Sequence, residues 1–201
     1  MMERRRSARM MPILHPFLTI RVNNRRDAES VGWLDGYLLM NIGMKGKGNM
    51  NTQTMQIVKL PPLRVASAWA FGPQPEGAAW EIMQTWAQAR GLLHDGARVF
   101  GFNNPSPAPG SPNYGYEYWL EVGPEVEPAA SDPVRIVHCA GGLYAVLEAD
   151  VTGDFNETIP AAWRELDRLV AESAYHAGTH QWLEQHTPAG LPFAFYFPIV
   201  E

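Results

Sequence analysis

The chain has 201 residues, 46% of them hydrophobic, with seven Trp and a formal net charge of −5. This length is enough for one domain with a sizeable core, and no apolar run approaches the roughly 20 residues of a membrane-spanning helix. The single cysteine, Cys139, excludes an intrachain disulfide. The apolar stretch near the start, MMPILHPFLTI, is too short and too broken by prolines for a signal peptide, so a cytoplasmic protein is expected.

Charge is distributed unevenly along the chain. Residues 1–49 contain nine of the 16 Lys and Arg but only four of the 21 Asp and Glu, so the remainder is strongly acidic. Because affinity for nucleic acids comes mainly from neutralising phosphates, this acidic body is not expected to bind nucleic acid directly. The same charge attracts cations.

Residues 1–49 fit no known module, and we leave them unassigned. The sequence KGKGN just before Met50 would be encoded by purine-rich codons that resemble a ribosome-binding site ahead of a start codon. We therefore expect residues 1–49 to be a disordered tail or the product of a misplaced start, with translation beginning at Met50 or Met55. The alternative is a basic arm that contacts acidic partners.

After this start, strand-like and helix-like segments alternate. The first half opens with the strand-rich segment 57–72. A helix is predicted over residues 76–92, because apolar side chains recur there at spacings of three and four. Its apolar stripe comprises Ala79, Ile82, Met83 and Trp86. Residues 97–104 and 114–122 are predicted strands, separated by the Pro-, Gly- and Ser-rich segment 103–113, which is either a rigid loop or a lid.

The second half repeats this order. Residues 132–151 predict two strands joined by a Gly-Gly turn. A helix is predicted over residues 159–175, with Pro160 near its first turn. Its apolar side comprises Ile159, Trp163, Leu166 and Val170. Two further strands are predicted within 179–187 and 191–200.

Each half therefore reads β-β-α-β-β, with the halves at about 55–124 and 132–201. One helix covers only one face of an antiparallel sheet, so the other face needs a partner. We predict an α+β fold of duplicated units with antiparallel sheets, related by a pseudo-twofold and meeting at a central ligand groove. Residues 50–201 form this single domain.

Two strands combine glutamate and tryptophan on one face. In YGYEYWLEV, strict alternation places Glu117 and Trp119 together. In QWLEQH, Trp182 and Glu184 share a face, which His186 extends. If the halves meet at a pseudo-twofold, both pairs converge on one cavity, and no Lys or Arg is adjacent to either glutamate in the sequence to neutralise it. A carboxylate among indole rings suits an organic cation, whereas the alternative is that one or both glutamates lie on exposed strand faces.

Three aromatic residues are further candidates for ligand contact. Trp69 and Phe71 alternate on a strand and either wall the groove or pack in the core, and Tyr116 precedes Glu117. No metal or cofactor is expected, because the chain has no metal-ligand spacing among its histidines, no Gly-rich phosphate loop and no Gly-x-Ser-x-Gly elbow.

The segments LPPLRVA, GFNNP, YGYEYWLEV, GGLYAV, IPAAWRELDRLVAESAY, QWLEQH and FYFPI occur in the order seen in the GyrI-like family, also called AraC-type effector-binding domains. The resemblance covers roughly residues 55–201 and implies duplicated β-α-β-β units with a ligand groove at the internal twofold. In multidrug-sensing members a buried glutamate neutralises cationic aromatic ligands, and the matching position here is Glu184, whereas Glu117 matches a less uniform position. The resemblance is to the stand-alone members, so a protein without an attached DNA-binding domain is expected.

Three hypotheses about function follow. The first is a protein that binds flat, apolar, cationic xenobiotics or metabolites, with Glu184 as charge partner and Glu117 assisting. In this hypothesis Trp119 and Trp182 are the stacking walls. The second is a hydrolase of strained, cyclopropane-bearing toxins, an activity that the resemblance implies for some members. Glu184 is then the general base that activates water, assisted by Tyr116, Tyr118 or Glu117. The third, implied by the resemblance alone, is a modulator of gyrase or of a transcription regulator through protein binding.

Overall fold

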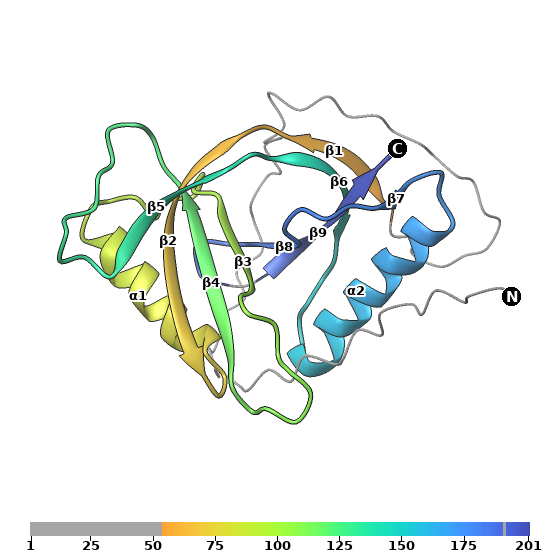
Figure 1. Cartoon of the computed structure of the whole chain (residues 1–201), viewed down its shortest axis with the longest axis horizontal. Helices are drawn as coiled ribbons and strands as arrows, with labels where there is room; N and C mark the ends of the chain where they lie inside the picture. Colours follow the sequence, from red (N-terminus) through yellow and green to blue (C-terminus); the bar gives the residue numbers. More distant parts are fainter. Residues whose placement is uncertain (1–53, 191) are drawn as a thin grey trace, which may run out of the picture.

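Figure 1 shows the computed structural model, which describes residues 54–190 and 192–201. The expectations for residues 1–49, including a start at Met50, lie outside this range. The elements are β1 (Gln56–Leu60), β2 (Leu63–Gly72), α1 (Glu76–Gln88), β3 (Val99–Asn103), β4 (Tyr114–Glu121), β5 (Val134–Cys139), β6 (Gly142–Glu148), α2 (Phe155–Ala171), β7 (His176–Ala177), β8 (Leu183–His186) and β9 (Pro192–Val200). Within the described part of the chain, neither helix is long and apolar enough to cross a membrane.

The strands form one antiparallel sheet in the order β1-β6-β9-β8-β3-β4-β2-β5, with β7 also paired to β9. The predicted antiparallel α+β class is therefore confirmed. The strand order is symmetric about its centre. Strands at equal distances from the two ends correspond to one another in the two halves of the chain: β1 to β5, β6 to β2, β9 to β4 and β8 to β3. β3 and β8 meet at the centre of this order, where Gly101 pairs with Glu184.

The sheet is strongly bent. β1 and β2 are joined only by residues 61–62, and β5 and β6 only by residues 140–141, yet the members of each pair stand near opposite ends of the strand order. A link of two residues spans only about 10 Å, so the ends of the sheet have to curve toward one another. Figure 1 shows the resulting arch of β1, β2, β5 and β6.

The two faces of the bent sheet hold separate apolar clusters. On the helix face, α1 packs on β2 and β4, and α2 packs on β6 and β9. The side chains buried there include Met83, Trp86, Trp163, Leu166 and Phe195. On the inner face, strands from both halves of the sheet contribute to a third cluster, which includes Val58, Phe100, Trp119, Tyr144 and Tyr196. Burying one large apolar side chain contributes about 1.5–3 kcal/mol, so both faces support the fold.

The first helix begins at Glu76 as predicted but ends at Gln88 rather than at residue 92, and the second helix differs from the prediction at both ends. The second helix begins at Phe155 rather than at residue 159, because the Asp154 side chain accepts a hydrogen bond from the Asn156 backbone N–H at 2.9 Å and caps the first turn. Pro160 therefore lies inside α2, not near its first turn. The short strand β7 was not predicted.

Candidate functional site

Glu184 lies on β8 and is only 5% exposed. Its Oε1 accepts a hydrogen bond from the Trp163 indole N–H at 2.9 Å. Its Oε2 accepts one from the Tyr116 hydroxyl at 2.9 Å, and the His186 Nε2 lies 3.7 Å from the same oxygen. The carboxylate is thus held by groups from a helix and two strands.

Strand register explains why these groups meet. Gly101 pairs with Tyr118 on one side and with Glu184 on the other, so these positions share the helix face of the sheet. A Cβ atom on Gly101 would lie 2.5 Å from the Tyr116 hydroxyl oxygen and 2.7 Å from His186 Nε2. The glycine therefore leaves the space that the tyrosine and the histidine occupy beside Glu184.

Two contributors to this site, Trp163 and Gly101, are not among the residues predicted from the sequence. Trp163 was assigned to the apolar side of its helix, and Gly101 was not singled out. A glycine inside a buried strand often marks the close approach of another group, which is the signal that VFGFN offered. Trp163 gave no such signal, because a core indole and an indole that donates to a carboxylate look the same in a sequence.

A cavity of about 250 Å³ adjoins Glu184 at the point where β3 and β8 separate. It is lined by Gly101, Phe102, Asn103, Ser106, Trp163, Gln181, Trp182 and Glu184. The rings of Trp163 and Trp182 lie 5.3 Å apart, so indole surface borders the carboxylate. Ser106 belongs to the loop that the sequence suggested as a lid.

Asn103 lines the cavity and carries a buried polar atom without a partner in the described part of the chain. Its Oδ1 is buried and has no hydrogen-bond donor among the described residues. Leaving a buried acceptor without a donor costs about 1–3 kcal/mol.

Tyr116 is kept neutral in this environment. Burial raises the pKa of its hydroxyl well above the usual value of 10.0, and the negative charge of Glu184 raises the pKa further. Tyr118, which lies 5.0 Å from Tyr116 between ring centroids, also has a raised pKa because of burial first and Glu184 second. Tyr116 therefore acts as a hydrogen-bond donor to the carboxylate across the physiological pH range.

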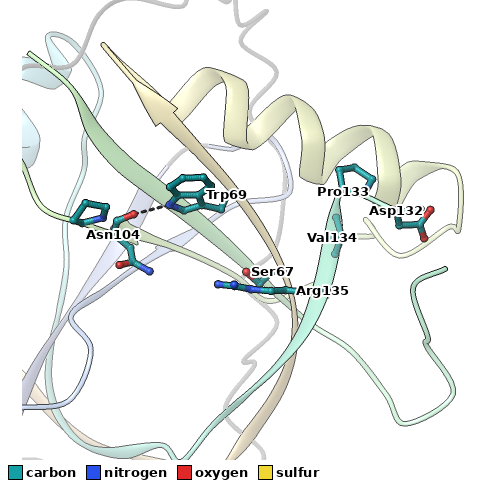
Figure 2. Close-up of a pocket in the computed structure, with 8 residues that line it drawn as sticks. Ser67, Trp69, Asn104, Asp132, Pro133, Val134 and Arg135 are labelled. Carbon is teal, nitrogen blue, oxygen red and sulfur yellow. Dashed lines mark hydrogen bonds between the residues drawn. The ribbon is translucent and has the colours of Figure 1, made fainter. Parts of the chain in front are cut away.

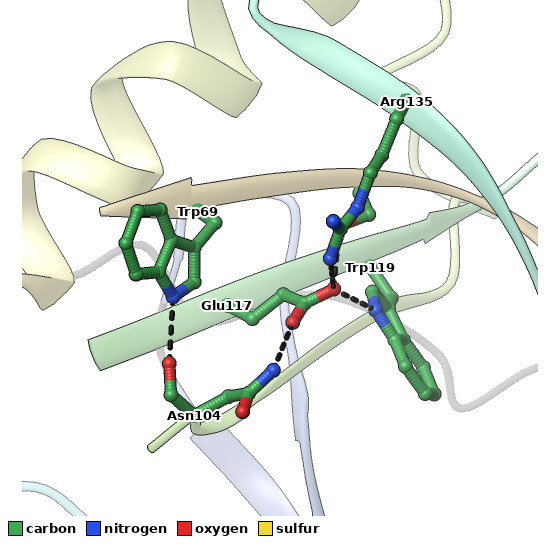
Figure 3. Close-up of polar contacts among 6 residues, drawn as sticks. Trp69, Asn104, Glu117, Trp119 and Arg135 are labelled. Carbon is green, nitrogen blue, oxygen red and sulfur yellow. Dashed lines mark hydrogen bonds and ion pairs between the residues drawn. The ribbon is translucent and has the colours of Figure 1, made fainter. Parts of the chain in front are cut away.

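Glu117 lies on β4, is 2% exposed, and has a different set of partners (Figure 3). Its carboxylate accepts hydrogen bonds from Ser67 Oγ at 2.5 Å, Trp119 Nε1 at 2.8 Å, Asn104 Nδ2 at 2.7 Å and Arg135 Nη2 at 3.4 Å. Burial alone would raise the pKa of Glu117, but the hydrogen bonds from Ser67, Asn104 and Trp119 and the charge of Arg135 outweigh it and lower the pKa. The expectation that no basic residue neutralises Glu117 is therefore wrong.

The prediction that Glu117 and Glu184 converge on one cavity is also wrong. On β3, Gly101 pairs with Glu184 while its neighbour Phe102 pairs with Glu117. Successive residues of a strand point to opposite faces, so the two carboxylates lie on opposite faces of the sheet. The tyrosines of β4 occupy the helix face, which leaves Glu117 on the other.

The remaining candidate residues fall into two groups. Tyr116 and Trp182 accompany Glu184, as described above. Trp119 is buried beside Glu117 on the inner face, with its ring 4.6 Å from that of Phe102. Trp69 and Phe71 are 45% and 55% exposed and stack at 6.1 Å, so they are not core residues. Trp69 lines a second hollow rather than the Glu184 cavity.

Solved structures share this fold at low sequence identity. The C-terminal domain of EcmrR matches with a TM-score of 0.54 and 14% identity, over 75% of this chain and 99% of that one. A hydrolase from Listeria innocua matches with a TM-score of 0.54 and 11% identity, over 76% of this chain and 94% of that one. EcmrR in a DNA complex matches with a TM-score of 0.56 and 11% identity, over 76% of this chain and 59% of that one.

Curated protein sequences gave no match to the chain. The sequence profile of the GyrI-like small molecule binding domain, in contrast, matches residues 53–185, which is more than half of the chain. The antiparallel sheet with one helix on each half and the likeness in fold to the EcmrR C-terminal domain agree with this match. The chain therefore belongs to the GyrI-like small molecule binding domain family.

Proposed function

We propose that the chain binds compact, flat, apolar organic cations in the Glu184 cavity. The observation that supports this proposal most is the position of the buried Glu184 carboxylate beside the neighbouring indoles of Trp163 and Trp182, whose planes are tilted by 49°. We further infer that the symmetric strand order reflects a duplicated β-β-α-β-β unit. In this view the cavity is the central groove, because β3 of one half meets β8 of the other beside it.

A cationic ligand suits the wall chemistry better than a neutral or anionic one. The carboxylate attracts positive charge, and each favourable contact between a cation and an indole face contributes about 0.5–2 kcal/mol. The volume of about 250 Å³ lies below the usual 300–1,000 Å³ of ligand pockets, so a ligand of two fused rings is a suitable size.

The test compares a cation with its neutral isostere. N-Methylquinolinium and 1-methylnaphthalene have nearly the same shape, and both are titrated into wild type and Glu184→Gln with tryptophan fluorescence as the readout. Wild type is expected to prefer the cation, and Glu184→Gln to lose about tenfold or more of the cation affinity while keeping that for the neutral compound. Glu165→Gln removes a carboxylate from the outer side of α2 and serves as the matched control.

Two results would refute the cation proposal. One is equal affinity of wild type for the charged and the neutral compound. The other is an unchanged cation affinity in Glu184→Gln, with circular dichroism showing that the variant is folded.

The second candidate is hydrolysis of a strained electrophile, which the buried contact of Glu184 with the neutral Tyr116 phenol favours. In this reaction Glu184 takes a proton from water while the water oxygen attacks a cyclopropane carbon of a spiro-cyclopropane dienone. The strained C–C bond breaks, its electron pair moves into the ring, and the resulting phenolate takes the proton, so the sum is addition of one water.

The simplest substrate of this type is the spiro-cyclopropane dienone that is hydrated to tyrosol. If the chain is a hydrolase, tyrosol appears in excess over the enzyme and Glu184→Gln abolishes its formation, as followed by ultraviolet absorbance and mass spectrometry. Saturable binding of the dienone without product would exclude this activity and leave binding as the function.

A further inference from the structure

A second hollow lies on the other face of the sheet from Glu184. Its volume is about 540 Å³, within the range of ligand pockets, and its walls include Ser67, Trp69, Asn104 and Arg135 (Figure 2). Figure 2 shows these side chains around one space, with β2 and β5 supplying three of them and the loop after β3 supplying Asn104. Glu117 lies behind this wall and contacts three of its residues (Figure 3).

Arg135 brings unused hydrogen-bonding capacity to this hollow. Its side chain is 67% exposed, and its one contact within the described chain is the 3.4 Å pair with Glu117. A guanidinium has five N–H donors in a planar fork, so most of them have no acceptor among residues 54–190 and 192–201. The contact with Glu117 orients the guanidinium but occupies only one of its nitrogen atoms, Nη2.

The other charged residue of the hollow is already engaged. Asp132 accepts hydrogen bonds from Trp86 Nε1 at 2.8 Å and from Arg90 Nη2 at 2.7 Å. The Glu117 carboxylate is likewise surrounded by four donors. The Arg135 guanidinium is therefore the charged group of the wall that has hydrogen-bond donors available for a ligand.

An aromatic surface borders the same space. The Trp69 ring is 45% exposed, although its indole N–H donates to the Asn104 carbonyl oxygen at 2.6 Å, which fixes the plane of the ring. Phe71 stacks beside it at 6.1 Å and is also exposed. The two rings offer exposed aromatic surface on which a flat ligand can stack.

We propose that this hollow is a second binding site that takes a flat aromatic carboxylate. The ligand ring lies against Trp69, and its carboxylate accepts two parallel hydrogen bonds from the fork of Arg135, which is the strongest geometry for such a pair. Glu117 is a positioning residue that holds Arg135 and Asn104 in place. The site is independent of the Glu184 cavity and has the opposite charge preference.

The probe for this site is 2-naphthoate, with the neutral 2-naphthamide as its isostere, titrated by calorimetry. Arg135→Gln is expected to weaken naphthoate about tenfold or more and to change naphthamide by less than about twofold. Trp69→Leu, which removes the ring surface, is expected to weaken both compounds. Arg168→Gln makes the same charge change on the exposed side of α2 and is expected to leave both affinities unchanged.

Glu184→Gln separates this site from the first cavity. If naphthoate entered the Glu184 cavity, removal of the negative charge there would raise its affinity, whereas binding at Arg135 leaves it unchanged. An affinity that rises in Glu184→Gln, or that survives in Arg135→Gln, overturns the proposal. Absence of saturable naphthoate binding to wild type at millimolar concentration also overturns it, and Arg135 is then only the ion-pair partner of Glu117.

Discussion

At the scale of single residues, Glu117 and Glu184 are both buried carboxylates with different surroundings. Burying a charge costs several kcal/mol unless partners compensate for it. Glu117 is compensated by Arg135 and three neutral donors, whereas the contacts described for Glu184 are a phenol, an indole and an imidazole beside a cavity. A substitution of Glu117 is therefore expected to change mainly the free energy of unfolding, and a substitution of Glu184 mainly the affinity for a ligand.

The stability contributed by Glu117 depends on pH with a definite sign. Its pKa is lower in the folded state than the ordinary value of 4.5, so its contribution is present above that value and is lost as the pH falls through the folded pKa. We expect Glu117→Gln to lower the free energy of unfolding by about 1–3 kcal/mol at pH 7, because buried donors lose a charged acceptor. The difference from wild type is expected to shrink below about pH 4.5.

Urea unfolding at neutral and acidic pH, followed by circular dichroism, checks this expectation. The control is Glu121→Gln, on the same strand, where an exposed pair with Arg98 is worth at most about 1 kcal/mol. The role assigned to Glu117 fails if its variant costs no more than the control, or if the difference from wild type is the same at both pH values.

At the scale of elements, β3 carries the close packing that assembles the Glu184 site. Gly101→Ala would place a methyl group 2.5 Å from the Tyr116 hydroxyl oxygen. We expect this overpacking to cost about 1–3 kcal/mol of unfolding free energy and to weaken binding of N-methylquinolinium, because Tyr116 loses its position beside Glu184. Thermal unfolding and fluorescence titration measure the two effects.

Gly77→Ala is the matched control in α1, where an added Cβ meets no atom within 4 Å. Alanine favours a helix over glycine by about 0.5–1 kcal/mol, so this variant is expected to be neutral or slightly more stable. If Gly101→Ala behaves like Gly77→Ala in both measurements, the tight contact with Tyr116 does not hold in solution.

The type and order of the elements could be predicted from the sequence because they depend on local patterns. The alternation in β4 correctly placed Glu117 beside Trp119, as their 2.8 Å hydrogen bond shows. The sequence also contains a signal for the start of α2, because Asp154 is followed three residues later by Glu157, a pattern typical of a helix N-terminus. The predicted start at residue 159 instead followed Pro160 and was therefore too late. The predicted start of this helix thus depended on whether the Asp154 pattern or Pro160 was taken as the signal.

At the scale of the whole molecule, the relation between the two carboxylates could not be predicted. Which face of the sheet Glu117 occupies depends on the register of β4 against β3, and the Arg135 contact depends on β5 lying next to β2. These pairings join residues distant in the sequence, and a change of one residue in register would exchange the faces. The Glu184 cavity therefore lies on the helix face of the sheet, and the hollow lined by Arg135 and Asp132 lies on the other face.

The most direct test of the central claim is the charge selectivity of the Glu184 cavity, measured as the ratio of the dissociation constants of 1-methylnaphthalene and N-methylquinolinium by titration calorimetry. The expected ratio is about ten or more for wild type and close to one for Glu184→Gln. A ratio near one in wild type, or the same selectivity in both proteins, would contradict the assignment of Glu184 as the charge partner of a cationic ligand.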